Sequence, residues 1–423
     1  MAATDTRATP ASRPYQWLLT ALLSLNFGIL FFDRNALNFL MPWVKDDLGL
    51  TNTQVGLTAS ALSLTWALSG IVFGALTDRS GRRKAFLLVA TVAFSLCSFL
   101  SGLASGFALL IGARMLMGAA EGGVMPVSHA MLVRAVDPQR RGVAMGIAQN
   151  FGSNLLGSFV APVLLVAFAT AFGWRSAFYL AGVPGLVSAA LMWWLIREEE
   201  QAMRPAVPGA KHLSAGAYAE IFASRNLVLC ALISILLVAY LVTCWAFMPL
   251  YLTSVRGFDA QTMGWLMGAL GISATFTSFA VPGLSDVNGR KPVMVAMAAL
   301  GVILPLGAMY FDGSAWWLAV IFFFGWALTG CFPMFMATIP SESIDARHVA
   351  TATGFVMGTG EILGGVMVPT LAGKVADATD LSAPLWIMLG LCTLAALIAL
   401  GLKETAPRVV ARVAGPLELT GAT

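Results

Sequence analysis

The sequence predicts an all-α membrane protein whose twelve transmembrane helices form two pseudo-symmetric six-helix bundles. Only 11% of the 423 residues are charged and 58% are hydrophobic, whereas soluble globular proteins carry about 25% charged residues. Apolar runs of about 20 residues recur along the chain, each long enough to cross a membrane core of roughly 30 Å as a helix. A loop motif of the first half returns in the second half, which indicates an internal repeat.

Twelve apolar runs predict the individual helices. Backbone groups inside lipid must be satisfied within their own segment, so helices are the expected element. The alternating segments of about ten residues that build a β-barrel are absent. We expect helices at 16–43, 53–77, 85–105, 108–131, 142–170, 174–196, 226–252, 262–284, 292–311, 315–338, 348–373 and 382–402.

Polar stretches divide the chain between and outside these helices. The longest of them begins with Arg197-Glu198-Glu199-Glu200 and contains two prolines. We therefore predict an N-terminal cytoplasmic tail over 1–15, a first bundle over 16–196, a cytoplasmic linker over 197–225, a second bundle over 226–402 and a cytoplasmic tail over 403–423.

The repeated loop motif runs from Gly74 to Lys84 and returns from Gly283 to Lys291, at an offset of 208 residues measured from Asp78 to Asp286. Its glycines permit a tight turn between two helices, and its aspartate suits a neighbouring helix N-terminus. The residues expected to act in gating are Gly74, Asp78, Gly81 and Arg82 in the first copy, and Gly283, Asp286, Gly289 and Arg290 in the second.

The distribution of Lys and Arg predicts the orientation. The termini, the linker and the loops on the motif side carry 19 of the 25 basic residues, the opposite side carries 4, and Arg34 and Arg114 lie inside predicted helices. Basic residues gather on the cytoplasmic side of membrane proteins. We therefore expect a multi-pass protein of the cell inner membrane with both termini in the cytoplasm, and we take the net charge of +4 as a topology signal that does not indicate nucleic-acid binding.

Four ionisable residues lie inside apolar helices of the first half: Asp33 and Arg34 in the first, Arg114 and Glu121 in the fourth. Each such charge costs about 2.5–3.5 kcal/mol at the membrane centre on insertion scales, so all four are expected to face a wet cavity or one another. Because equal numbers of each sign are present, a purely structural lattice remains an alternative. In it, Arg114 pairs with Glu121 or Asp33, and Arg34 pairs with the other acid.

Helix geometry places these groups together. Arg114 and Glu121 are seven residues apart and share a face, with Gly118 between them leaving room for a ligand or for the first helix. Arg34 and Asn38 share a face at i, i+4. Two guanidinium groups in one cavity suit a carboxylate, which each can hold by a two-pronged hydrogen bond. The two acids are candidate proton carriers, because a poorly hydrated carboxyl group holds its proton more tightly and a nearby arginine favours the charged form.

The double loop motif resembles the major facilitator superfamily, which places it after the second and eighth helices. Within that superfamily, Asp-Arg in the first helix and Arg-x-x-x-Gly-x-x-Glu-Gly in the fourth resemble the anion:cation symporter family, which includes bacterial sugar-acid and phthalate permeases. The resemblance implies alternating access, a substrate anion held by Arg34, and a proton relay through Asp33, Glu121 and Arg114. Members that carry sugar acids often have a tyrosine three positions before the arginine; Phe31 stands there instead, which slightly favours an aromatic or less polar acid.

Further substrate contacts are expected from both halves. Gln149 and Asn150 in the fifth helix are polar groups able to hydrogen-bond the substrate or a neighbouring helix. Glu361 is the main ionisable group inside the helices of the second half. The aromatic residues expected to line the cavity are Phe31, Tyr240 and Trp245.

The sequence thus predicts a monomeric importer of an organic carboxylate by proton symport, and it leaves open whether the acid is a sugar acid, an aromatic acid or a dicarboxylic acid. A proton-driven efflux antiporter of the same fold is the first alternative, although the fifth helix lacks the Gly-x-x-x-Gly-Pro-x-x-Gly-Gly pattern of many exporters. A membrane sensor that binds without transport is a second. No phosphate-binding loop, nucleophile elbow or metal-spaced cluster indicates an enzyme, and we expect no cofactor and no metal.

Overall fold

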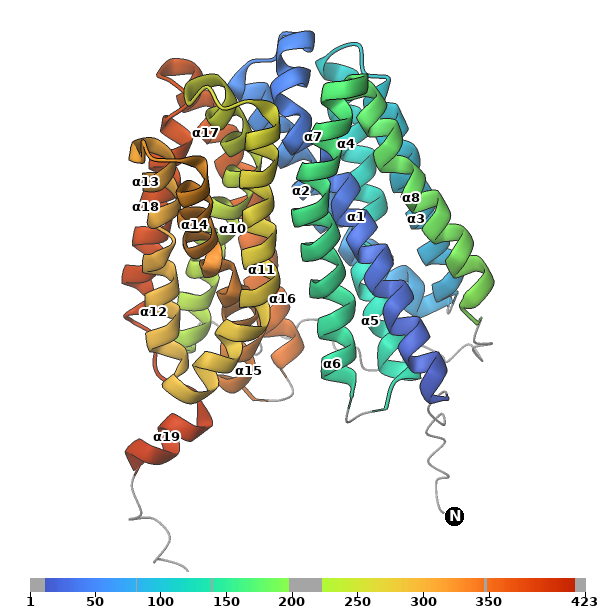
Figure 1. Cartoon of the computed structure of the whole chain (residues 1–423). Coiled ribbons are helices and arrows are strands. Elements are labelled where there is room, and N and C mark those ends of the chain that lie inside the picture. The colour runs from blue at the N-terminus through green and yellow to red at the C-terminus, as the bar shows by residue number, and fades with distance from the viewer. Residues whose placement is uncertain (1–11, 81, 138–139, 198–222, 346–347, 415–423) are drawn as a thin grey trace, which may run out of the picture.

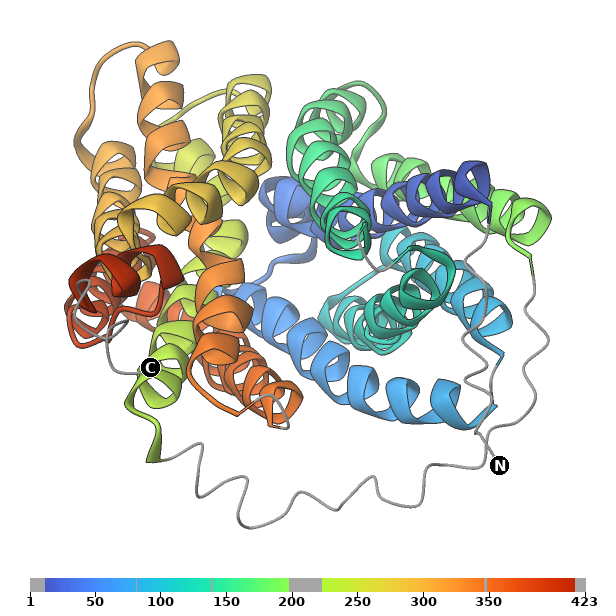
Figure 2. The ribbon, with the colours of Figure 1, turned by 90° about the horizontal axis from the view of Figure 1, so that it is seen from below.

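A computed structural model describes residues 12–80, 82–137, 140–197, 223–345 and 348–414. All regular secondary structure in these ranges is helical. Figure 1 shows long helices standing side by side, and Figure 2, the view along them, shows the helices of the two chain halves as two neighbouring groups.

In the described residues, the first half forms six helical rods, the fifth of which changes from α-helical to π-helical geometry and back along its length. They are α1 (Arg13–Leu48); α2 (Asn52–Ser80); α3 (Arg83–Gly102); α4 (Phe107–Glu121) with α5 (Val124–Ala135); α6 (Arg141–Gly146) with η1 (Ile147–Phe151), η2 (Ser153–Val160) and α7 (Ala161–Phe172); and α8 (Trp174–Leu195).

Over its described ranges, the second half forms six more rods, followed by a short helix. They are α10 (Arg225–Leu250) with η3 (Tyr251–Val255); α11 (Ala260–Asn288); α12 (Arg290–Leu300) with α13 (Ile303–Tyr310); α14 (Ala315–Gly325) with η4 (Trp326–Cys331), η5 (Met334–Thr338) and α15 (Ile339–Glu342); α16 (Val349–Thr359) with η6 (Gly360–Met367) and α17 (Val368–Ala378); α18 (Ala383–Ala399); and finally α19 (Pro407–Ala414).

These rods confirm the predicted helical membrane fold. Ten of the described segments are long and apolar enough to cross a membrane, and α18 is a shorter apolar helix. The 29-residue α2 occupies the second predicted span. Each predicted run therefore coincides with one rod, with ends that differ by a few residues.

Small residues allow the rods of the first half to pack closely. A Cβ atom at Gly157 would collide with the backbone and side chain of Phe31, and one at Gly152 would collide with Ser24. The α1 helix therefore lies directly against the fifth rod. Close approach through small residues is the usual basis of helix packing in lipid, where no hydrophobic force draws helices together. This packing fixes the turn of α1 that carries the charged residues.

Hydrogen bonds join the two halves at the end of the molecule opposite the described N-terminus (Figure 1). There, the Asp377 carboxylate of α17 accepts hydrogen bonds from the backbone N–H groups of Asn52 and Thr53, each at 2.8 Å, and from the Thr53 hydroxyl at 2.6 Å. Two turns further along, the hydroxyls of Ser60 and Thr370 lie 2.8 Å apart. We call the contact of Asp377 with Asn52 and Thr53 the polar clasp.

Candidate functional site

The charged residues of the first and fourth rods meet inside the first half. A guanidinium nitrogen of Arg34 lies 3.7 Å from Glu121 Oε2, which makes a loose ion pair. The Glu121 side chain has no exposed surface, whereas that of Arg34 is 16% exposed. Because 3.7 Å is too long for a hydrogen bond, Arg34 retains donors for another anion.

Arg114 lies behind this pair and is 1% exposed. Its guanidinium donates to the Arg34 carbonyl at 3.2 Å and to the Ser101 hydroxyl at 3.1 Å, and it lies 5.7 Å from the centre of the Phe178 ring. The first bond ties Arg114 to the backbone of α1 at the residue that carries the exposed guanidinium. This geometry suits a group that positions α1 and balances charge, with little surface left for direct contact with a substrate.

Asp33 is fully buried, and among the described residues neither of its carboxylate oxygens has a hydrogen-bond partner. Arg114 lies close enough to interact with it electrostatically, and so does Glu121. A buried carboxylate without a hydrogen bond is costly as a charged group. Such a side chain is suited to taking up and releasing a proton when its surroundings change.

Two aromatic rings lie next to the exposed guanidinium. The central carbon of the Arg34 guanidinium lies 5.7 Å from the ring centre of Phe31 and 5.3 Å from that of Trp66. Trp66 was not among the predicted site residues, because a tryptophan in an apolar helix is typical of packing or of the membrane interface. Aromatic faces attract cations, so the two rings hold the guanidinium in place and offer flat apolar surface beside it.

The expectation that Gly118 leaves room for a ligand or for the first helix is wrong. A Cβ atom there would collide with Thr65 and with the backbone of Leu62. The second rod, α2, therefore occupies the space, and the Ser69 hydroxyl donates to the Gly118 carbonyl at 3.2 Å. Gly118 brings α2 close to the charged residues, which explains how Trp66 reaches Arg34.

The side chains predicted to make polar contacts with the substrate have intermediate exposure. This holds for Asn38, Gln149, Asn150 and Glu361. Glu361, in η6 of the second half, lies close enough to interact electrostatically with Arg34. The amide of Asn38 is 3.5 Å from the Asn35 side-chain oxygen, and that of Gln149 lies 4.0 Å from the sulfur of Met125 and beside the His129 ring. These amides therefore retain hydrogen-bonding capacity.

The predicted aromatic residues of the second half are more deeply placed. Tyr240 has no exposed surface and its hydroxyl donates to the Gly301 carbonyl at 2.9 Å, so in this conformation it packs within the second half. Trp245 is 8% exposed and makes edge contacts with Phe39 of the first half and with Trp326. Trp245 thus lies at the boundary between the halves.

The second copy of the loop motif forms a bonded network. The Arg290 guanidinium lies 2.6 Å from Asp286 Oδ1 and 3.0 Å from Glu342 Oε1. Glu404, beyond the last long helix, accepts hydrogen bonds from the backbone N–H groups of Arg290 at 2.7 Å and Lys291 at 3.1 Å. These interactions connect the loop to the ends of two other rods.

Gly289 makes the sharp turn in this network, with a φ of 105° and a ψ of 148°, a backbone region that is essentially restricted to glycine. Gly283 lies inside α11. In the first copy, Arg82 is exposed just before α3. Gly81 and the side chain of Asp78, like the surroundings of Gly74, lie outside the described residues.

Comparison with known proteins identifies the family. A family model described as Major Facilitator Superfamily matches residues 23–362 and 245–418. The hexuronate transporter of Bacillus subtilis (strain 168) is 28% identical over 377 residues, which cover 85% of this chain and 88% of the relative. The gallate transporter of Pseudomonas putida is 26% identical over 422 residues, which cover 91% of each chain.

The fold also matches solved transporter structures. The inward-facing, unoccupied crystal structure of a bacterial homolog to the human lysosomal transporter Spinster superposes with a TM-score of 0.75 at 18% identity, covering 92% of this chain and 97% of the other. The chain belongs to the Major Facilitator Superfamily and is a multi-pass membrane transporter, not an enzyme.

Proposed function

We propose that this transporter imports an organic carboxylate together with protons by alternating access. The observation that carries the proposal is the loose pair of Arg34 with Glu121, in which a partly exposed cation faces a fully buried acid at 3.7 Å. An incoming carboxylate can take a two-pronged hydrogen bond from the guanidinium.

The pair provides a physical reason for coupling. A proton on Glu121 removes the charge that holds Arg34, which strengthens the interaction of Arg34 with a substrate anion. By thermodynamic reciprocity, a bound anion favours protonation of Glu121 by the same factor. Asp33, buried without a hydrogen bond, is the second proton carrier, and Arg114 positions the group.

The remaining side chains around the site have complementary roles in this proposal. Arg34 binds the carboxylate, and the rings of Phe31 and Trp66 contact the body of the substrate. Polar groups of the substrate are met by side chains of both halves: Asn38, Gln149, Asn150, Glu361 and, at the boundary, Trp245.

The relatives support an acid as the substrate. The names of the two relatives compared above refer to a hexuronate, which is a sugar acid, and to gallate, which is a hydroxylated aromatic acid. Both carry a carboxylate, the group that the exposed guanidinium fits best. The aromatic surface beside Arg34 favours a ring-bearing acid.

The end with the polar clasp is the closed entrance in this proposal, and the two motif loops lie at the opposite end, in the cytoplasm. The protein acts as a monomer in the cell inner membrane, with both termini in the cytoplasm. The bundles rock about the central site, and the loop network of the second half stabilises one state of the cycle.

The test is uptake by purified protein reconstituted in liposomes, with a panel of sugar acids, aromatic acids and dicarboxylic acids. An acidic exterior should drive accumulation of at least one acid by the wild type. Glu121→Gln should lose this accumulation and retain exchange of labelled for unlabelled substrate. Asp312→Asn, which changes an acid that is 92% exposed, is the matched control.

Two results would contradict the proposal. If Glu121→Gln accumulated substrate as the wild type does, Glu121 would not be a residue that couples proton movement to transport. Uptake stimulated by an acidic interior would instead indicate the efflux antiporter.

A further inference from the structure

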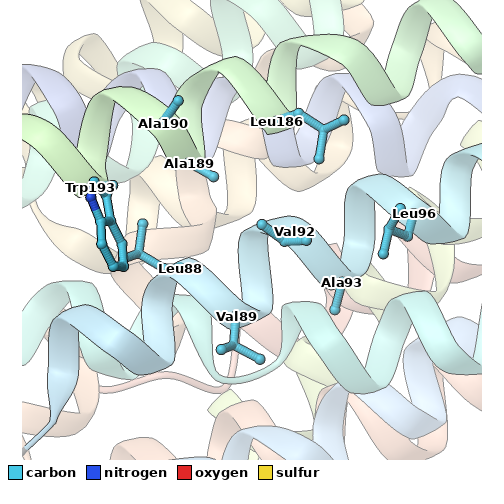
Figure 3. A pocket seen from close by; sticks show the side chains of 9 residues that line it. All are labelled: Leu88, Val89, Val92, Ala93, Leu96, Leu186, Ala189, Ala190 and Trp193. Atoms are coloured by element: carbon cyan, nitrogen blue, oxygen red, sulfur yellow. The ribbon is translucent and has the colours of Figure 1, made fainter.

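A groove on the outer, lipid-facing surface of the first half has no role in the proposed transport site. It lies between α3 and α8 and has a volume of about 590 Å³ (Figure 3). Its lining contains no charged side chain. The main lining residues are Leu88, Val92 and Leu96 from α3 and Leu186, Ala189 and Trp193 from α8.

The spacing of these residues explains the groove. Leu88, Val92 and Leu96 follow one another at intervals of four, so they form one stripe along α3. On α8, the small side chain of Ala189 lies between those of Leu186 and Trp193 (Figure 3). Large residues therefore form the sides of the groove and an alanine forms part of its floor.

The groove has the length of one membrane leaflet. From Leu88 to Leu96 the helix rises about 12 Å, and half of a hydrocarbon core of about 30 Å is roughly 15 Å. It begins one turn from the start of α3, near the end of α8. The Arg197 backbone N–H, just after α8, donates to the Tyr15 hydroxyl at 2.9 Å, so this end lies at the membrane face where α1 starts.

Positive charge marks that end of the groove. The Lys84 ammonium lies 5.7 Å from the centre of the Trp193 ring, which is 68% exposed, and Figure 3 shows Trp193 beside Leu88. Arg197, just after α8, lies at the same end of the bundle, with its guanidinium carbon 5.1 Å from the centre of the Tyr15 ring on α1. A tryptophan at the level of the head groups with basic residues above it is typical of sites that hold anionic lipids.

We propose that the α3–α8 groove binds one anionic phospholipid of the leaflet on this face. An acyl chain lies along Leu88, Val92 and Leu96, and the phosphate lies against the Lys84 ammonium above Trp193. The binding is independent of the transport site, because none of the groove residues belongs to it.

Native mass spectrometry of the full-length protein tests the proposal, with phosphatidylglycerol and phosphatidylcholine of identical acyl chains as probes. The wild type should retain one phosphatidylglycerol in preference to phosphatidylcholine. Val92→Phe fills the groove and should abolish this retention. Lys84→Gln removes the charge at the rim and should weaken it roughly fivefold.

Matched controls lie on α12, the counterpart of α3 in the second half. Ala296 is exposed on that helix, and Lys291 is its second residue. Ala296→Phe and Lys291→Gln should retain phosphatidylglycerol as the wild type does.

Three results would overturn the proposal. The first is equal retention of both lipids by the wild type. The second is unchanged retention in Val92→Phe and Lys84→Gln. The third is a protein dimer that Val92→Phe dissociates, since a second copy of the chain would then be the occupant.

Discussion

The two halves have the same arrangement of six helical rods, and they differ in which residues occupy equivalent buried positions. By the 208-residue offset, the positions of Asp33, Arg34, Arg114 and Glu121 correspond to Leu241, Val242, Phe322 and Thr329. These four charged residues lie in the interior of the first half, whereas Arg290, Asp286, Glu342 and Glu404 of the second half meet at its loop end.

This difference shows that the degree of burial alone does not decide whether a position is charged or apolar. Arg114 is 1% exposed and its counterpart Phe322 is 0% exposed, yet one is charged and the other is apolar. Arg114 has polar partners on α1 and α3. Because Arg34, Glu121, Asp33 and Arg114 all belong to one half, a rigid movement between the halves would leave their mutual interactions intact.

The largest effect on stability is expected when the buried Arg114 of the first half is replaced by an apolar residue, as at the equivalent position of the second half. Arg114→Leu removes the cation beside Asp33 and should lower the free energy of unfolding by about 3–5 kcal/mol, the usual cost of breaking a buried ionic group. Thermal unfolding in detergent measures the change. Phe322→Leu is the control, with an expected loss of about 1–2 kcal/mol. Equal losses in the two variants would mean that the charges contribute no more than packing.

Substrate affinity should depend on the cation of the first half. Arg34→Ala removes the two-pronged hydrogen bond and should weaken binding of the transported acid by roughly 100-fold or more, since each bond to a charged group contributes about 1.5–3 kcal/mol. Isothermal titration calorimetry measures the affinity. Arg175→Ala removes an arginine whose ion pair with Asp47 is solvent-exposed, and it should bind normally. If Arg34→Ala bound the acid with normal affinity, the carboxylate would bind at a site other than Arg34.

The loop of the second half should be sensitive at its turn. Gly289→Ala forces a side chain into a glycine-only backbone region and against Glu404, at an expected cost of about 1–3 kcal/mol. Gly283→Ala, in the same motif but inside α11 with open space around it, should leave the unfolding temperature unchanged or raise it. A stable Gly289→Ala variant would show that this loop tolerates another turn.

The smallest effect is expected at the aspartate of the second motif copy. Asp286 is 57% exposed, and Arg290 keeps its bond to Glu342 when Asp286 is lost. Asp286→Asn should therefore change turnover in liposomes by about twofold or less, whereas Asp78→Asn in the first copy should slow the cycle several-fold. Similar turnover in both variants would make the two loops equivalent.

Much of the architecture could be predicted because membrane helices are specified locally. Long apolar runs, small polar interruptions and the repeated motif each signal a rod or a loop without reference to the rest of the chain. The four charged residues also stood out locally, because each is costly in lipid unless it has a partner.

The partners themselves could not be predicted, because they depend on which rods become neighbours. The face shared by Arg114 and Glu121 followed from helix periodicity, but the identity of the rod that packs on Gly118 did not. For the same reason, Trp66 was missed and Tyr240 was expected at the cavity. An aromatic residue in an apolar helix has the same appearance in sequence whether it contacts a cation, a carbonyl or lipid.

The chemistry of the polar clasp affects how the two halves can separate at that end of the molecule. Its three hydrogen bonds join the Asp377 carboxylate to exposed groups, so water can replace each lost partner when this end separates. In the proposed transport cycle, this end can therefore open without leaving its polar groups unpaired.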